Sequence, residues 1–80
     1  MRILDTINDS ALKNVILYMK INEAKELYDS IGQLLDKIDF NNHAHINDEL
    51  YEHEITVVLY DEKHTDSLSE RSKEIIFEDI

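Results

Sequence analysis

The sequence predicts a small α+β domain with a three- to four-stranded antiparallel or mixed sheet and two helices on one face of it. Two patterns support this fold class: apolar residues recur at helical spacing from Ala24 to Ile38, and inward and outward positions alternate from Glu54 to Tyr60. The third observation concerns turns. The chain has no proline and one glycine, so clusters of Asn, Asp and Ser at 8–10, 39–42, 47–48 and 61–67 mark the breaks between elements. Eighty residues leave room for a single domain, residues 1–80.

The first elements are strands followed by a helix. The β-branched and aromatic segment Val15–Met19 predicts a strand, and Arg2–Ile7 is a candidate hairpin partner across the turn at 8–10. With that partner the element order is ββαββα, and without it βαββα. The helix is predicted over residues 23–38, with Asn22 as its cap.

This helix carries one apolar stripe at i, i+3, i+4 and i+7 spacing. Glu23 and Glu26 lie at the positive end of its dipole, and Lys37 lies at the negative end. Gly32 costs about 1 kcal/mol against alanine in a helix interior. It indicates either a close approach to another backbone or a tolerated surface glycine. The stripe consists of Ala24, Leu27, Tyr28, Ile31, Leu34, Leu35 and Ile38.

The second half of the chain predicts a hairpin and a second helix. Strands are expected at His43–Ile46 and Glu54–Tyr60. Ser67 and Glu70 have the spacing of a capping box, which predicts a helix over residues 67–78. The residues from Glu74 onward are also compatible with a final strand or a frayed tail.

The predicted sheet leaves one face open. Ala44 and Ile46 on one strand, and Ile55, Val57 and Leu59 on the next, require burial against the helices. The opposite face then has three interpretations: a solvated surface, a docking site for another protein, or a homodimer interface that supplies the burial a small domain lacks. We favour the homodimer. The residues expected on this face are Ile16, Tyr18, His43, His45, Thr56, Val58 and Tyr60.

The spacing of His43 and His45 raises the question of a metal site. A His-x-His pair on a strand directs both rings to one side of the sheet, where Glu54, His53 or Asp48 are candidate third ligands. However, the pair lacks the four-ligand spacing of a zinc motif. We therefore expect no metal and no cofactor, and His43 and His45 remain weak metal candidates.

The charge of the chain limits its partners. Residues 1–40 carry a net charge of −2 and residues 41–80 a net charge of −8. Such a surface repels phosphate groups, so we expect binding neither to nucleic acid nor to membranes. It suits a basic protein partner, or solubility alone. The absence of cysteine, of a signal-peptide pattern and of an apolar run near the roughly 18 residues of a membrane span indicates the cytoplasm.

Catalytic motifs are absent from the sequence. It contains no cysteine nucleophile, no Gly-x-Ser-x-Gly elbow, no phosphate-binding glycine loop and no His-Glu-x-x-His helix. We therefore expect a non-enzymatic protein-binding or regulatory module. The alternatives are a metal-binding protein or enzyme centred on the His-x-His pair, and an acidic mimic of nucleic acid that occupies a basic protein.

Several short motifs carry a resemblance. The run His43-x-His45-Ile46-Asn47-Asp48, the later Glu54-Ile55-Thr56-Val57 and Tyr60-Asp61, and the Glu-Ala-Lys-Glu-Leu segment at 23–27 are similar to small uncharacterised proteins of Gram-positive bacteria and their phages. The resemblance covers most of the chain and implies no activity, cofactor or partner. It favours a bacterial cytoplasmic setting.

Overall fold

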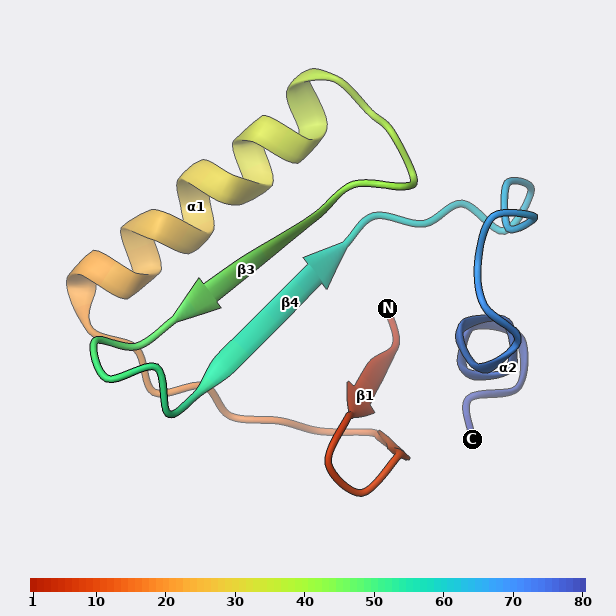
Figure 1. The fold of residues 1–80 in the computed structure, drawn as a ribbon, viewed down its shortest axis with the longest axis horizontal. Helices are drawn as coiled ribbons and strands as arrows, with labels where there is room; N and C mark the ends of the chain where they lie inside the picture. The colour runs from red at the N-terminus through yellow and green to blue at the C-terminus, as the bar shows by residue number, and fades with distance from the viewer. The chain divides into compact units, whose positions relative to one another are not determined.

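The computed structural model describes residues 1–80 and has the element order ββαββα, one of the two orders predicted, although its second strand is not the predicted one. The chain divides into two compact units, one made of residues 1–17 and 62–80 and the other of residues 18–61. Each unit is described by itself below. The elements are β1 (Ile3–Asp5), β2 (Ser10–Leu12), α1 (Ile21–Asp36), β3 (His43–Asn47), β4 (Glu54–Val58) and α2 (Glu70–Glu78) (Figure 1).

The prediction of one three- to four-stranded sheet is only partly correct. The chain is α+β with four strands, but they form two separate antiparallel pairs, β1–β2 and β3–β4. The predicted strand Val15–Met19 is absent, because residues 14–20 have no regular secondary structure. β1 pairs instead with β2, which lies immediately after the turn.

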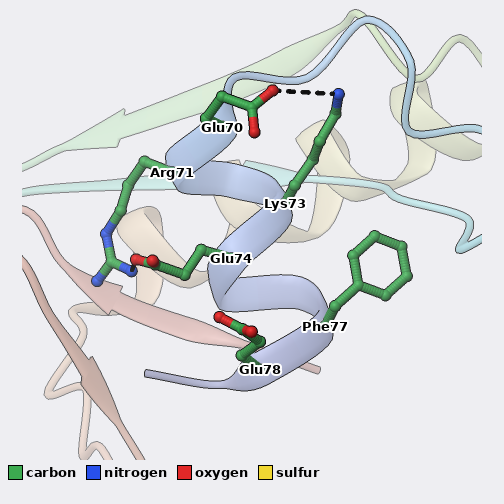
Figure 2. Close-up of a pocket in the computed structure, with 6 residues that line it drawn as sticks. All are labelled: Glu70, Arg71, Lys73, Glu74, Phe77 and Glu78. Carbon is green, nitrogen blue, oxygen red and sulfur yellow. Dashed lines mark hydrogen bonds and ion pairs between the residues drawn. The ribbon is translucent and has the colours of Figure 1, made fainter.

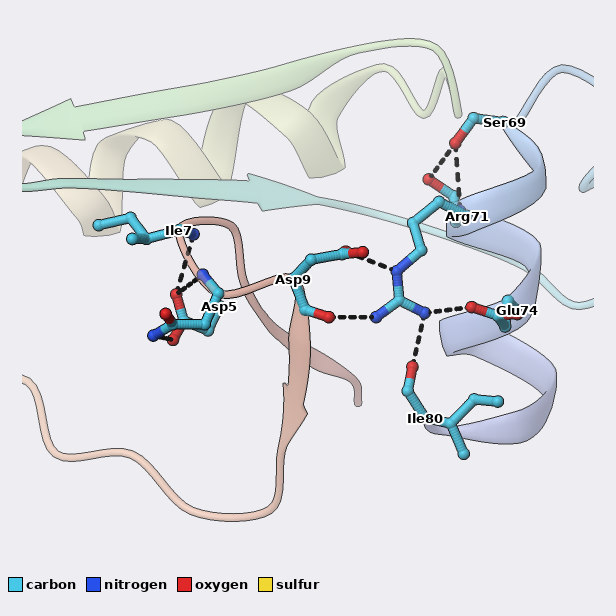
Figure 3. Close-up of polar contacts among 9 residues, drawn as sticks. Asp5, Ile7, Asp9, Ser69, Arg71, Glu74 and Ile80 are labelled. Atoms are coloured by element: carbon cyan, nitrogen blue, oxygen red, sulfur yellow. Dashed lines mark hydrogen bonds and ion pairs between the residues drawn. The ribbon is translucent and has the colours of Figure 1, made fainter.

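The register of the first hairpin explains why that strand does not form. Ile3 lies opposite Leu12 and Asp5 opposite Ser10. The Asp5 carboxylate closes the turn by accepting hydrogen bonds from the backbone N–H groups of Ile7 at 3.0 Å and Asn8 at 3.3 Å (Figure 3). This register pairs β1 with Ser10–Leu12, so β1 is not available to the segment at 15–19. That segment pairs with no strand of the structure, and propensity alone does not make a strand.

The unit of residues 18–61 consists of α1 and the β3–β4 hairpin. The helix runs beside β3 in the opposite direction, and β4 lies on the other side of β3 (Figure 1). Burial alternates along both strands as predicted, with Ala44, Ile46, Ile55 and Val57 less exposed than their neighbours. The core of this unit is small: Leu34 of α1 and Ile46 of β3 are its buried residues.

α1 begins two residues earlier than predicted. Lys20, and not Asn22, is the residue at the N-cap position, and its backbone N–H donates to the Glu23 carboxylate at 2.7 Å. This contact satisfies one of the free N–H groups at the helix start. Gly32 has no atom within 4 Å of the position a Cβ would occupy, so no other part of the chain approaches it closely.

The unit of residues 1–17 and 62–80 packs the first hairpin with α2. Ser69 caps the helix, because its hydroxyl accepts a hydrogen bond from the Ser72 backbone N–H at 3.1 Å. The helix therefore starts at Glu70 and not at 67. It continues through Glu78 and ends at Asp79, whose left-handed backbone directs its N–H to the Ile75 carbonyl at 3.1 Å. The C-terminal residues are thus helical and do not form a strand.

Arg71 joins three parts of this unit (Figure 3). Its Nε donates to the Asp9 carboxylate at 2.7 Å, and its Nη2 donates to the Asp9 carbonyl at 3.2 Å. Its Nη1 donates to Glu74 at 2.5 Å and to the Ile80 carbonyl at 2.6 Å. The hydrogen bond that Arg71 donates to the Asp9 carboxylate is the main cause of a raised Arg71 pKa. One guanidinium thus ties the β1–β2 turn to α2 and to the end of the chain.

A core substitution tests the packing of the unit that contains α1. Ile46→Ala removes most of a side chain that is 3% exposed, so we expect it to cost about 2–5 kcal/mol of unfolding free energy. Val58→Ala, on the outward face of the same hairpin, is the matched control and should cost less than about 1 kcal/mol. Urea unfolding followed by circular dichroism measures both. Equal losses would contradict the assignment of inner and outer faces.

A second substitution tests the role of Arg71. Arg71→Lys retains the positive charge but loses the planar fork that serves several acceptors at once. We expect it to lower the melting temperature by about 2–5 °C, nearly as much as Arg71→Ala. Lys73→Ala removes only an exposed pair with Glu70 at 3.6 Å and is the control. A lysine variant as stable as the native chain would show that charge, and not geometry, is what matters at this position.

Candidate functional site

The outer face of the β3–β4 hairpin holds four of the seven residues predicted for an open sheet face. His43 lies opposite Val58, and His45 lies opposite Thr56. All four side chains are exposed. The two imidazole rings contact each other edge to face, with ring centres 4.9 Å apart and an angle of 88° between the planes. The structure therefore brings these four residues together on one side of a two-stranded sheet.

The other three predicted residues lie outside this sheet. Ile16 and Tyr18 belong to the segment that was expected to be a strand, and they are 76% and 91% exposed. Tyr60 follows the end of β4 and is partly buried. The face that remains is narrower and more polar than predicted, because it lacks its aromatic and aliphatic third strand. A dimer through this face stays a prediction.

The polar contacts of this face centre on His45. Its Nδ1 lies 2.6 Å from a Glu54 carboxylate oxygen and 2.9 Å from the Thr56 hydroxyl. The side chains of His45 and Glu54 are each 48% exposed, so water competes for both groups. No group of three or more His, Asp or Glu side chains in residues 1–80 has an arrangement that could hold a metal ion.

The loop between β3 and β4 is organised by Asp48. Its carboxylate accepts hydrogen bonds from the backbone N–H of Glu52 at 2.8 Å and of His53 at 3.3 Å, and it lies 2.5 Å from Nδ1 of His53. Tyr51 completes the turn with a left-handed backbone, φ 55°. Asp48 and His53, predicted as candidate metal ligands, are instead partners of each other at the tip of the hairpin.

This pair makes loop stability depend on pH. Its hydrogen bond raises the pKa of His53 and lowers the pKa of Asp48. A raised histidine pKa contributes stability below the unfolded value of about 6.5 and loses it as pH rises through the folded value. A lowered aspartate pKa contributes stability above about 3.9 and loses it as pH falls through the folded value. The Asp48–His53 pair therefore stabilises the loop most between about pH 4 and 6.5.

Removing the charge of Asp48 tests this coupling. In Asp48→Asn the amide oxygen still accepts backbone hydrogen bonds, but the ion pair is gone, so the pKa of His53 should fall toward its ordinary value. NMR titration of the imidazole protons measures it, with the His43 resonance as the internal reference. A His53 titration that is the same in both proteins would show that the two side chains do not interact in solution.

Exposed apolar side chains follow α1 and the residues just after it. The face of α1 toward β3 is formed by Leu27 and Leu34, which are partly or fully buried. A second line of side chains, about a quarter of a turn around the helix, is exposed. We call this line, together with Ile38 just beyond the helix end, the α1 seam. It consists of Ile21, Ala24, Tyr28, Ile31, Leu35 and Ile38.

The α1 seam was not recognised in the sequence as a separate surface. The sequence predicts one apolar stripe on the helix, whereas the structure divides it between a buried and an exposed line. Tyr28 is 80% exposed and Leu35 is 56% exposed. The signal was present in the spacing, because residues 21, 24, 28, 31, 35 and 38 follow the alternating three- and four-residue steps of a coiled-coil seam.

A hollow of about 550 Å³ lies along α2. Every residue that lines it belongs to that helix, and the charged side chains pair along it, Glu70 with Lys73 and Arg71 with Glu74 (Figure 2). Phe77 is the one apolar side chain among them (Figure 2). The hollow is thus a groove on the outside of one helix, and it does not bring together groups from different elements as catalytic sites do.

Comparisons with known proteins identify no relative: no family model, no curated protein and no solved structure matches the chain. The resemblance to small proteins of Gram-positive bacteria and phages stays a prediction. None of the helices is both long enough and apolar enough to cross a membrane.

Proposed function

We propose that this chain is a non-enzymatic protein-binding module and that the α1 seam is its binding surface. The observation that carries the proposal is the run of exposed apolar side chains at regular spacing along one ordered helix. Apolar residues scattered singly over a surface need no explanation, but a contiguous apolar patch marks an interaction site. Recognition through a helix face uses this i, i+3, i+4, i+7 pattern of anchors.

The composition of the seam supports this proposal. Tyr28 supplies an aromatic anchor, and tyrosine is enriched at the centres of protein interfaces. Ile31 and Leu35 flank it on the next turns of the helix. The charged residues Lys25 and Asp36 are exposed on α1 beside the seam, where they can form a polar rim.

The outer face of the hairpin is the second candidate surface. A homodimer through His43, His45, Thr56 and Val58 would bury only one aliphatic side chain from each copy. Charging the two histidines at low pH would also oppose their burial. This face therefore has weaker support than the α1 seam. A metal site or an enzyme centred on the histidine pair has no further support.

The acidic surface suggests a different class of partner. The net charge of −10 suits a basic protein, either as a partner of the seam or as the target of a nucleic-acid mimic. Binding as a nucleic-acid mimic would depend on charge, whereas binding through the seam would depend on apolar contact. High salt should therefore weaken the first kind of binding and not the second. A bacterial cytoplasmic setting is part of the proposal and rests on the absence of cysteine and the resemblance given above.

A capture experiment tests the proposed surface. Immobilised native chain, Leu35→Glu and Gln33→Glu are each exposed to a bacterial lysate and, separately, to the purified native chain at about 0.15 M and 1 M salt. Gln33 is exposed on the opposite side of α1, so Gln33→Glu adds the same charge away from the seam. We expect a protein that binds the native and Gln33→Glu chains at both salt concentrations and is lost with Leu35→Glu.

Two outcomes would contradict this function. Capture that disappears at high salt and does not depend on Leu35 would favour the nucleic-acid mimic. No capture from either source would leave the seam without a binding role.

A further inference from the structure

We propose that the partner of the α1 seam is a second copy of the same chain, with the two α1 helices paired antiparallel. This inference rests on the proposed function, because it names the occupant of the same surface. Three features of the described residues support it: the symmetry of the spacing, the area that pairing would cover, and the charges beside the seam.

The spacing of the seam is symmetric about its middle. If two copies run antiparallel around a two-fold axis, the helical seam positions from 24 to 35 face their counterparts in the other copy. In the same register Tyr28 meets Ile31, and the small Ala24 meets the larger Leu35. Antiparallel coiled-coil packing uses such alternating positions as facing knobs and holes. A two-fold interface uses each residue twice, so one short seam supplies both halves.

The area of the seam is sufficient for a weak dimer. Ile21, Tyr28 and Leu35 are 78%, 80% and 56% exposed, so pairing would cover side chains that now contact solvent, in an interface near the lower end of specific ones, about 1,200 Å². α1 has 16 residues and is about 24 Å long at 1.5 Å per residue, which keeps the two helices in contact over several turns. We therefore expect a dissociation constant of about 10–100 µM.

The charges beside the seam favour the antiparallel direction. Lys25 and Asp36 are exposed on the same flank of α1, near its opposite ends. Antiparallel pairing places Lys25 of one copy beside Asp36 of the other, whereas parallel pairing places Lys25 beside Lys20 of the other copy. Gly32 lies on the same flank with open space around it. The missing side chain leaves room for the Lys25 stem of the second copy.

Sedimentation equilibrium over about 5–500 µM protein measures the association directly. We expect the native chain and Gln33→Glu to dimerise alike, and Leu35→Glu to weaken dimerisation at least about tenfold because it places a charge in an apolar interface. Tyr28→Glu is a second seam variant. Circular dichroism verifies that each variant is folded, as expected for substitutions at exposed positions. A native chain that stays monomeric throughout the range would overturn the inference.

Cysteine pairing tests the direction of the helices, and the absence of natural cysteine makes it specific. A chain with Ala24→Cys mixed with a chain with Leu35→Cys should form a mixed disulfide under mild oxidation, because antiparallel pairing of α1 brings these helical positions together. Disulfides formed only between two Ala24→Cys chains would instead show a parallel pair and would contradict the proposal.

The outcomes separate this inference from the proposed function. A monomeric chain that still captures a lysate protein through Leu35 would overturn the second copy as partner and keep the seam as a binding surface. A dimer that is unaffected by Leu35→Glu but is lost with Val58→Glu would move self-association to the hairpin face and would also overturn the inference. Neither self-association nor capture would remove both proposals.

Discussion

The way α1 packs beside the β3–β4 hairpin determines much of what this unit exposes. α1 contacts mainly β3, and β4 lies on the other side of β3 (Figure 1). The hairpin therefore covers only one line of this amphipathic helix. In α1 the covered line contains Leu27 and Leu34, and the line next to it remains exposed.

The protein also has little core. Its buried hydrophobic residues are Leu34, Ile46, Ile75 and Ile76, and no polar residue is buried. A domain of this size has a thin stability margin even when it is well packed, and the usual remedies are disulfides, metals and association. This chain has no cysteine and no arrangement of ligands for a metal. The proposed pairing through the α1 seam would add apolar burial to this core.

Polar contacts hold the parts that apolar packing does not reach. Arg71 connects a turn, a helix and the chain end in one unit, and Asp48 closes the hairpin loop in the other. Both groups are near the surface, so each contact contributes modestly and responds to salt or pH. Their main effect is geometric, because each one orders several backbone groups at once.

Part of this structure could be read from the sequence because it depends on local patterns. The helices, the β3–β4 hairpin, its inner and outer faces and the outward histidines follow from spacing that neighbouring residues enforce. The division into two separate sheets could not be predicted from the sequence, because the segment at 15–19 has strand propensity but no strand pairs with it. Which strand pairs with which is decided by the turn at Asp5 and the register it sets.

The α1 seam shows the same division. Its heptad spacing can be recognised in the sequence, but the sequence does not determine which of the apolar lines on the helix is buried. That choice depends on the position of the sheet beside the helix, which only the tertiary structure decides.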